Sequence, residues 1–171
     1  MQERIAQLDD ALIDRVCQPL VNRMAAGASV DCYRLARLCN DAAALVWLLS
    51  RMGCISDALA SGNVGLAGAQ SALVLIGLGA LLTLRRVFEG RSGGARANPL
   101  RPAMFLHRVA CLLWLGVLLL GSLSGPGGLM ELLTIGVALM MTASVYVGAC
   151  SSPPPQRRSS RMRAWQHALA R

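Results

Sequence analysis

The chain has 171 residues, of which 54% are hydrophobic and only 15% are charged. Soluble proteins carry about 25% charged residues, so this composition argues against a water-soluble domain and favours helices that face lipid. The formal net charge of +8 is typical either of nucleic-acid binding or of a positive-inside membrane topology, and the hydrophobicity favours the second.

Residues 1–28 are predicted to form an amphipathic N-terminal helix, cytoplasmic or interfacial. Apolar side chains recur there at spacings of three and four, as on one face of a helix. These side chains are Ile5, Leu8, Leu12, Val16, Leu20 and Met24. Pro19 lacks a backbone donor and should kink or split the helix. We expect the helix to lie on the membrane surface or on the bundle, with docking of another protein as the alternative.

Residues 29–150 are predicted to form the membrane domain of an all-α integral membrane protein. Its four transmembrane helices are expected at about 30–52, 64–84, 104–123 and 128–149. The second span is the clearest, because it contains no charge and ends at Arg85 and Arg86. The first is the weakest, since its apolar core AAALVWLL is short and Arg51 is expected to end it. The predicted fold is thus a four-helix bundle with amphipathic surface helices at both termini.

Residues 151–171 are predicted to form a basic cytoplasmic tail. It begins with the polyproline segment SSPPPQ and continues into a stretch in which Met162, Trp165 and Leu169 share one helical face. Such a basic amphipathic helix lies on anionic lipid, with its aromatic ring at head-group depth. The expected lipid-contacting residues are Arg157, Arg158, Arg161, Arg163 and Trp165.

The distribution of arginine predicts the orientation. Five Arg lie before residue 38, five lie in the connection 85–103, and five lie in the tail. Four spans place all three segments on one side, which the positive-inside rule makes the cytoplasm. The expected location is therefore a bacterial inner membrane with both termini inside. A three-span chain, without 30–52, would leave the N-terminal arginines outside.

Arg51 and Glu131 are the predicted polar pair. An acid within an apolar span is costly and often functional. Both residues lie at the outer ends of their predicted helices, so we expect a structural ion pair, with proton or cation transport by Glu131 as the alternative. The six cysteines have no CxxC spacing and only two His are present, so neither a metal site nor a cofactor is predicted.

The sequence contains no motif that indicates catalysis, such as GxSxG, HExxH or a P-loop. The expected function is a non-catalytic accessory or assembly subunit of a membrane complex. Its expected partners are the bilayer, anionic lipid head groups and a membrane protein or second copy, with no nucleic acid. The first alternative is a small transporter or holin-like pore, and the second is a lipid-modifying membrane enzyme.

Overall fold

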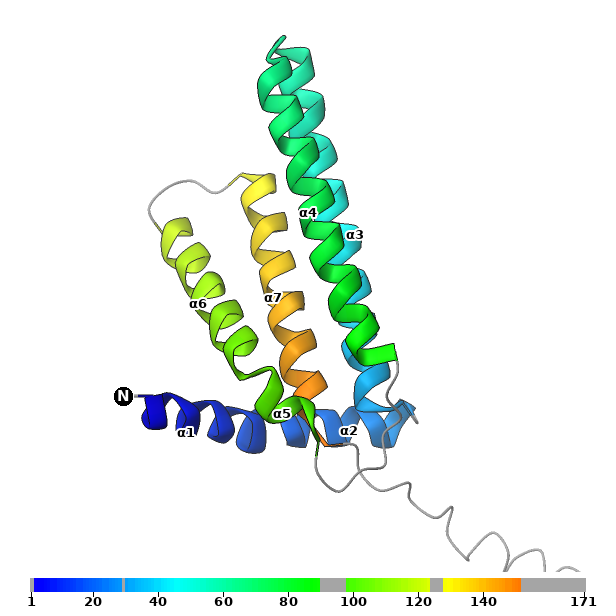
Figure 1. The fold of residues 1–171 in the computed structure, drawn as a ribbon, viewed down its shortest axis with the longest axis vertical. Helices are drawn as coiled ribbons and strands as arrows, with labels where there is room; N and C mark the ends of the chain where they lie inside the picture. Colours follow the sequence, from blue (N-terminus) through cyan, green and yellow to red (C-terminus); the bar gives the residue numbers. More distant parts are fainter. Residues whose placement is uncertain (1, 29, 90–97, 124–127, 152–171) are drawn as a thin grey trace, which may run out of the picture.

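The computed structural model describes residues 2–28, 30–89, 98–123 and 128–151, without the side chains of 2 and 25–28. Within these ranges the chain is helical and contains no strand (Figure 1). The helices are α1 (Gln2–Leu12), the π-helical turn η1 (Ile13–Cys17), α2 (Gln18–Ala28), α3 (Cys32–Ala60), α4 (Val64–Glu89), α5 (Leu100–Ala103), α6 (Phe105–Ser122) and α7 (Leu129–Ala149).

Four of these helices, α3, α4, α6 and α7, are long and apolar enough to cross a membrane. At about 1.5 Å per residue, the 21 residues of α7 reach about 31 Å, close to the thickness of a hydrocarbon core. The predicted fold class is confirmed: the chain is an all-α, multi-pass membrane protein with four spans.

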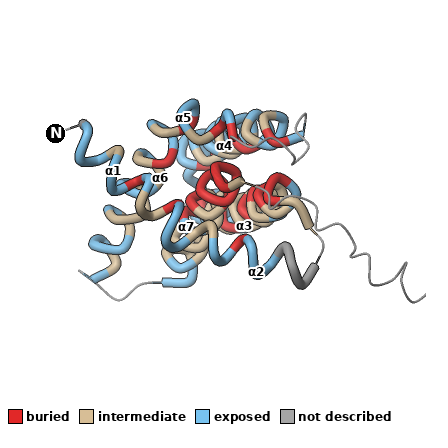
Figure 2. Tube along the Cα trace, turned by 90° about the horizontal axis from the view of Figure 1, so that it is seen from below, coloured by how far each residue is buried: buried red, intermediate tan, exposed pale blue. Residues whose placement is uncertain are grey.

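The four spans form a row rather than a closed ring. α6 packs on α7, α7 packs on α3, and α3 packs on α4. Seen from below, buried residues gather where α7 and α3 meet in the middle of the row (Figure 2). Because α4 contacts chiefly α3 and α6 contacts chiefly α7, none of the described helices covers the outer faces of these two end helices.

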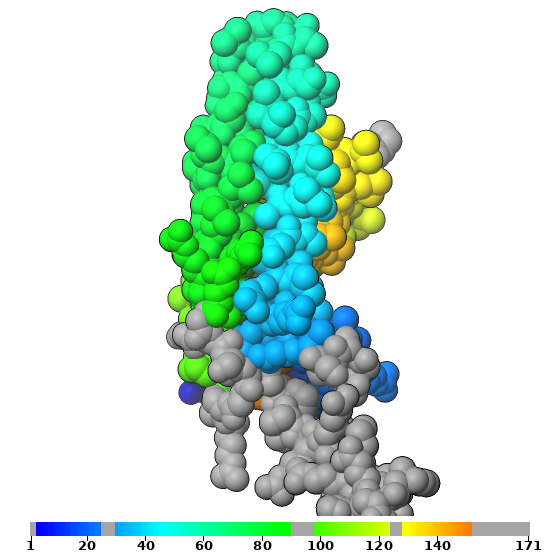
Figure 3. Space-filling model, turned by 90° about the vertical axis from the view of Figure 1, so that its right-hand side faces the viewer, coloured from blue at the N-terminus to red at the C-terminus, as the bar shows by residue number. Residues whose placement is uncertain are grey.

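The first span is longer than predicted, because α3 continues past Arg51 to Ala60. The segment after Arg51, MGCISDALA, contains no proline that would end the helix, and four of its nine residues (Met52, Ala58, Leu59 and Ala60) favour helix strongly. The true turn signal is SGN at 61–63: Gly62 has φ +71°, and the Asn63 side chain accepts the Leu66 N–H at 3.0 Å. The prediction of a loop over 52–63 was therefore wrong. Figure 3 shows the α3–α4 hairpin rising beyond the end of α7.

The N-terminal helix continues through Pro19 and lies across one end of the bundle (Figure 1). The predicted break takes the form of η1, in which the Gln18 N–H donates to the Ile13 carbonyl, five residues back. A π-helical turn is wider than an α-helical turn, so it accommodates a missing proline donor without ending the helix.

The main hydrophobic core lies at this end of the bundle, where the N-terminal helix meets the spans. Its side chains include Ile13, Val21, Phe88, Val145 and Tyr146. The predicted apolar stripe of the N-terminal helix is a different face: Leu8 stays 72% exposed, and Val16 and Leu20 each stay 56% exposed. The helix therefore docks chiefly through residues beside that stripe. Of the stripe itself, Leu12 packs against the core, whereas Leu8, Val16 and Leu20 stay exposed.

Candidate functional site at the foot of the bundle

Two rows of side chains, each spaced by four residues, attach the N-terminal helix to the bundle. One row is buried or half-buried and contains Asp9, Ile13, Cys17 and Val21. The other is polar and contains Asp10, Asp14, Gln18 and Asn22. In a pure α-helix a spacing of four drifts around the axis, since a turn takes 3.6 residues. The wider turn η1 reduces that drift and keeps both rows aligned over the bundle.

A buried ion pair lies at the centre of this contact. Arg108 from α6 and Asp9 from α1 are only 1% and 5% exposed. The Arg108 Nε donates to Asp9 Oδ2 at 3.0 Å, and Nη2 donates to the same oxygen. The Tyr146 hydroxyl from α7 donates to Asp9 Oδ1 at 2.7 Å. Three helices far apart in the sequence therefore meet at one carboxylate.

A second, more exposed ion pair lies beside the first. Arg101 of α5 donates to Asp10 Oδ1 at 2.9 Å and to both oxygens of Asp14 at 2.8 Å. The hydrogen bond from Arg101 lowers the pKa of the Asp14 carboxyl, and the same bond raises the pKa of Arg101. The two pairs are linked, because Arg108 Nη1 donates to the Arg101 carbonyl at 2.7 Å.

Asn98 connects the start of α5 to the end of α7. Its amide nitrogen donates to the carbonyls of Gly148 at 2.8 Å and Cys150 at 2.6 Å. Its side-chain oxygen accepts the Tyr33 hydroxyl at 3.0 Å and the Leu100 N–H at 2.9 Å. One side chain thus satisfies four polar groups and fixes the chain that enters α5.

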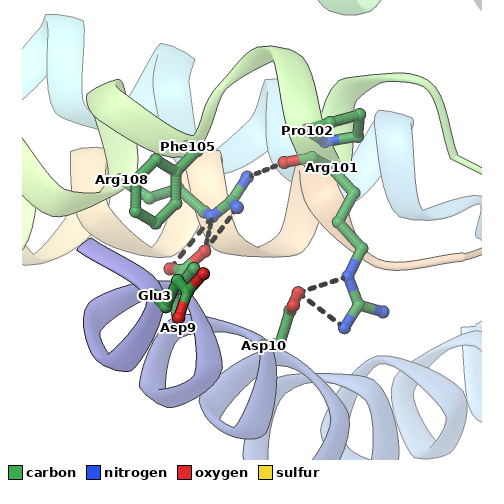
Figure 4. A pocket seen from close by; sticks show the side chains of 8 residues that line it. Glu3, Asp9, Asp10, Arg101, Pro102, Phe105 and Arg108 are labelled. Carbon is green, nitrogen blue, oxygen red and sulfur yellow. Dashed lines mark hydrogen bonds and ion pairs between the residues drawn. The ribbon is translucent and has the colours of Figure 1, made fainter. Parts of the chain in front are cut away.

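A cavity of about 550 Å³ opens between α1 and the α5–α6 corner (Figure 4). Its charged lining consists of three carboxylates and the two guanidinium groups of the ion pairs. Its apolar lining comes from Ala6, Pro102 and Phe105. The charged residues are Glu3, Asp9, Asp10, Arg101 and Arg108.

The structure does not bring together Arg51 and Glu131, which were predicted to form an ion pair. Arg51 Nη1 donates to Gln70 of α4 at 3.0 Å, and its guanidinium stacks on Trp47 at 4.3 Å from the ring centroid. Glu131 lies in the first turn of α7, where the helix dipole favours a carboxylate. Arg51 lies nine residues before the end of α3 and turns toward the hairpin partner α4, and no described ion pair joins it to Glu131.

The predicted lipid-contacting residues Arg157, Arg158, Arg161, Arg163 and Trp165 lie outside the described residues. Sequence reasoning did not predict the side chains of the two linked ion pairs, which we call the foot cluster: Asp9, Asp10, Asp14, Arg101, Arg108 and Tyr146. The available signal was Arg108, a cation just inside an apolar span, which demands a counter-ion. The four-residue recurrence of acids at Asp10 and Asp14, next to Asp9, marks the helix that supplies it.

The two arginines of the foot cluster make their described polar contacts within the chain. Arg101 and Arg108 direct their N–H groups at carboxylates or a carbonyl, so their charge is used within the chain. In the described part of the chain, no three His, Cys, Asp or Glu side chains gather as a metal site. All six cysteines are free thiols.

Comparison of the chain with protein-family models, with curated proteins and with solved structures finds no match in any of the three.

Proposed function

We propose that this protein is a non-catalytic accessory or assembly subunit of a complex in a bacterial inner membrane. The observation that carries the proposal is the open row of spans, in which α4 contacts chiefly α3 and leaves its outer face free for a helix of another membrane protein.

The small, exposed residues on the outer face of α4 favour a helix of another protein as the partner. Gly68, Ala72, Leu75 and Gly79 are exposed and recur at three and four. A Cβ at Gly68 or Gly79 would meet nothing within 4 Å. Glycine within a helix costs about 1 kcal/mol relative to alanine, and these two glycines serve no packing inside the chain. Close approach of another transmembrane helix is the usual use of such a surface.

The use of charge inside the chain also supports a structural role. Asp9 and Arg108 join α1 to α6, Arg101 joins α5 to the N-terminal helix, and Arg85 reaches Asp41 across the α3–α4 hairpin at 3.4 Å. These ion pairs hold helices in place, which a scaffold requires.

The proposed orientation has both termini in the cytoplasm. It is supported by the order of arginines in the sequence, since four spans put the three arginine-rich segments on one side of the membrane. The N-terminal helix lies across the end of the bundle at which α7 finishes (Figure 1). In this orientation its uncovered stripe, including Leu8 and Val16, lies at the inner membrane interface.

The accessory role is tested by purifying the tagged full-length chain from native membranes in a mild detergent. We expect a defined partner to co-purify with the wild type and with Gly116→Leu, and to be lost with Gly79→Leu. Both changes place the same side chain on a glycine with open space around it, one on α6 and one on α4. Recovery of a lone chain, or equal recovery of the partner with both variants, contradicts the proposal.

The orientation is tested separately with reporter fusions. Green fluorescent protein after Arg171 should fluoresce, and alkaline phosphatase inserted at Gly62 should be active, because that enzyme matures only outside the cytoplasm. Active alkaline phosphatase fused after Arg171 would place the C-terminus outside the cytoplasm and contradict the proposed orientation.

A further inference from the structure

In the cavity between α1 and the α5–α6 corner, both guanidinium groups are engaged by carboxylates, but one lining carboxylate is in no described ion pair. Arg108 and Arg101 already donate to Asp9, Asp10, Asp14 and a backbone carbonyl. Glu3 lines the cavity and forms no ion pair with any described residue. An anion would therefore meet carboxylates, whereas an ammonium group would find an unpaired carboxylate.

The position of the cavity selects for an amphiphile. Phe105 lines it and begins the span α6. Leu112 and Leu119 follow Phe105 at spacings of seven, so they lie on the same face of α6, and they are 37% and 44% exposed. An apolar surface therefore continues from the cavity toward the membrane. A molecule with an ammonium head in the cavity could lay its acyl chains on that surface.

We propose that this cavity binds the head group of a zwitterionic phospholipid with a primary amine, of the phosphatidylethanolamine class. The ammonium donates to Glu3, the carboxylate of the lining that no described arginine engages (Figure 4). Ala6, Pro102 and Phe105 contact the glycerol and the first methylenes. A primary ammonium suits the cavity better than a quaternary one, because it brings N–H donors to carboxylate acceptors.

The lining carries three carboxylates against two guanidinium groups, so an anionic head group is disfavoured. The inference does not rest on the proposed accessory role, since it concerns a different face of the molecule. It is also distinct from the predicted binding of anionic lipid by the tail, where cationic arginines would contact phosphates, whereas here a carboxylate would contact an ammonium group.

Native mass spectrometry of the full-length chain tests the proposal. Delipidated protein is incubated with equal amounts of phosphatidylethanolamine, phosphatidylcholine or phosphatidylglycerol, and the lipid-bound fraction is measured. We expect the amine lipid to be retained best. Glu3→Gln should weaken its binding about tenfold, the effect of losing one charge-assisted hydrogen bond.

Two further variants separate the cavity from general charge effects. Glu131→Gln removes the same charge at the opposite end of the bundle and should leave binding unchanged. Ala6→Leu keeps all charges but fills the cavity, and should lower retention of the amine lipid. Stronger retention of phosphatidylcholine or phosphatidylglycerol, or unchanged binding in Glu3→Gln, overturns the proposal. Among the described residues Glu3 forms no ion pair, so Glu3→Gln should fold, and circular dichroism of each variant verifies the helix content.

Discussion

The buried ion pair between Asp9 and Arg108 should dominate the docking of the N-terminal helix. Replacing Arg108 by Met leaves a carboxylate that is 5% exposed with Tyr146 as its remaining donor. Removing one partner of a buried ion pair costs about 3–5 kcal/mol. Since about 1.4 kcal/mol corresponds to a factor of ten, the open form of the docked helix should become roughly 150- to 5,000-fold more populated.

Hydrogen–deuterium exchange in lipid nanodiscs measures that opening. Amides between Asp9 and Val21 should lose protection in Arg108→Met, while amides in the middle of α4 should keep theirs. Asp9→Leu should have a similar effect, because it leaves the guanidinium buried without its partner.

The double variant Asp9→Leu, Arg108→Met separates the pair from its surroundings. It removes both charges, so protection should recover most of the way toward the wild type. The residual loss should be about 1 kcal/mol, because the Tyr146 hydroxyl loses its acceptor. Unchanged protection in either single variant, or a double variant with the summed loss of the singles, would refute the reasoning.

Two further predictions concern the pH dependence of docking and the packing of α4. Because Arg101 lowers the pKa of Asp14 from 3.8, their pair stabilises the fold fully above about pH 5 and loses its effect as the pH falls below 3.8. Thermal unfolding of Asp14→Asn should show a small deficit in stability, below about 1 kcal/mol for a pair this exposed, that shrinks as the pH falls below 3.8; a constant deficit would contradict the assignment. Gly77→Leu should lower stability by about 1–3 kcal/mol or more, because a Cβ there would lie 2.3 Å from Trp47 Nε1. Gly79→Leu, two residues on and facing open space, should unfold at or above the wild-type temperature, because leucine favours helix more than glycine does. Equal loss of stability in both variants would disprove the steric argument.

The sequence by itself determined the class of protein and the position of its spans. Long apolar runs must be helical in lipid, since each helix satisfies its own backbone hydrogen bonds. The starts of the later spans agree with those predicted within a residue or two, because apolar runs such as 64–84 have clear charged or glycine-rich borders. The end of α3 was missed, since Arg51 was expected to end a helix that continues to Ala60.

Only the tertiary structure decided which charges meet. Arg51 was predicted to pair with Glu131 because both were expected at the outer ends of their helices, yet the Arg51 side chain turns to Gln70 and Trp47. Asp9 and Arg108 are 99 residues apart, and no local pattern links them. Helix periodicity shows which side chains share a face of one helix, whereas the partner across the contact depends on how two helices lie against each other.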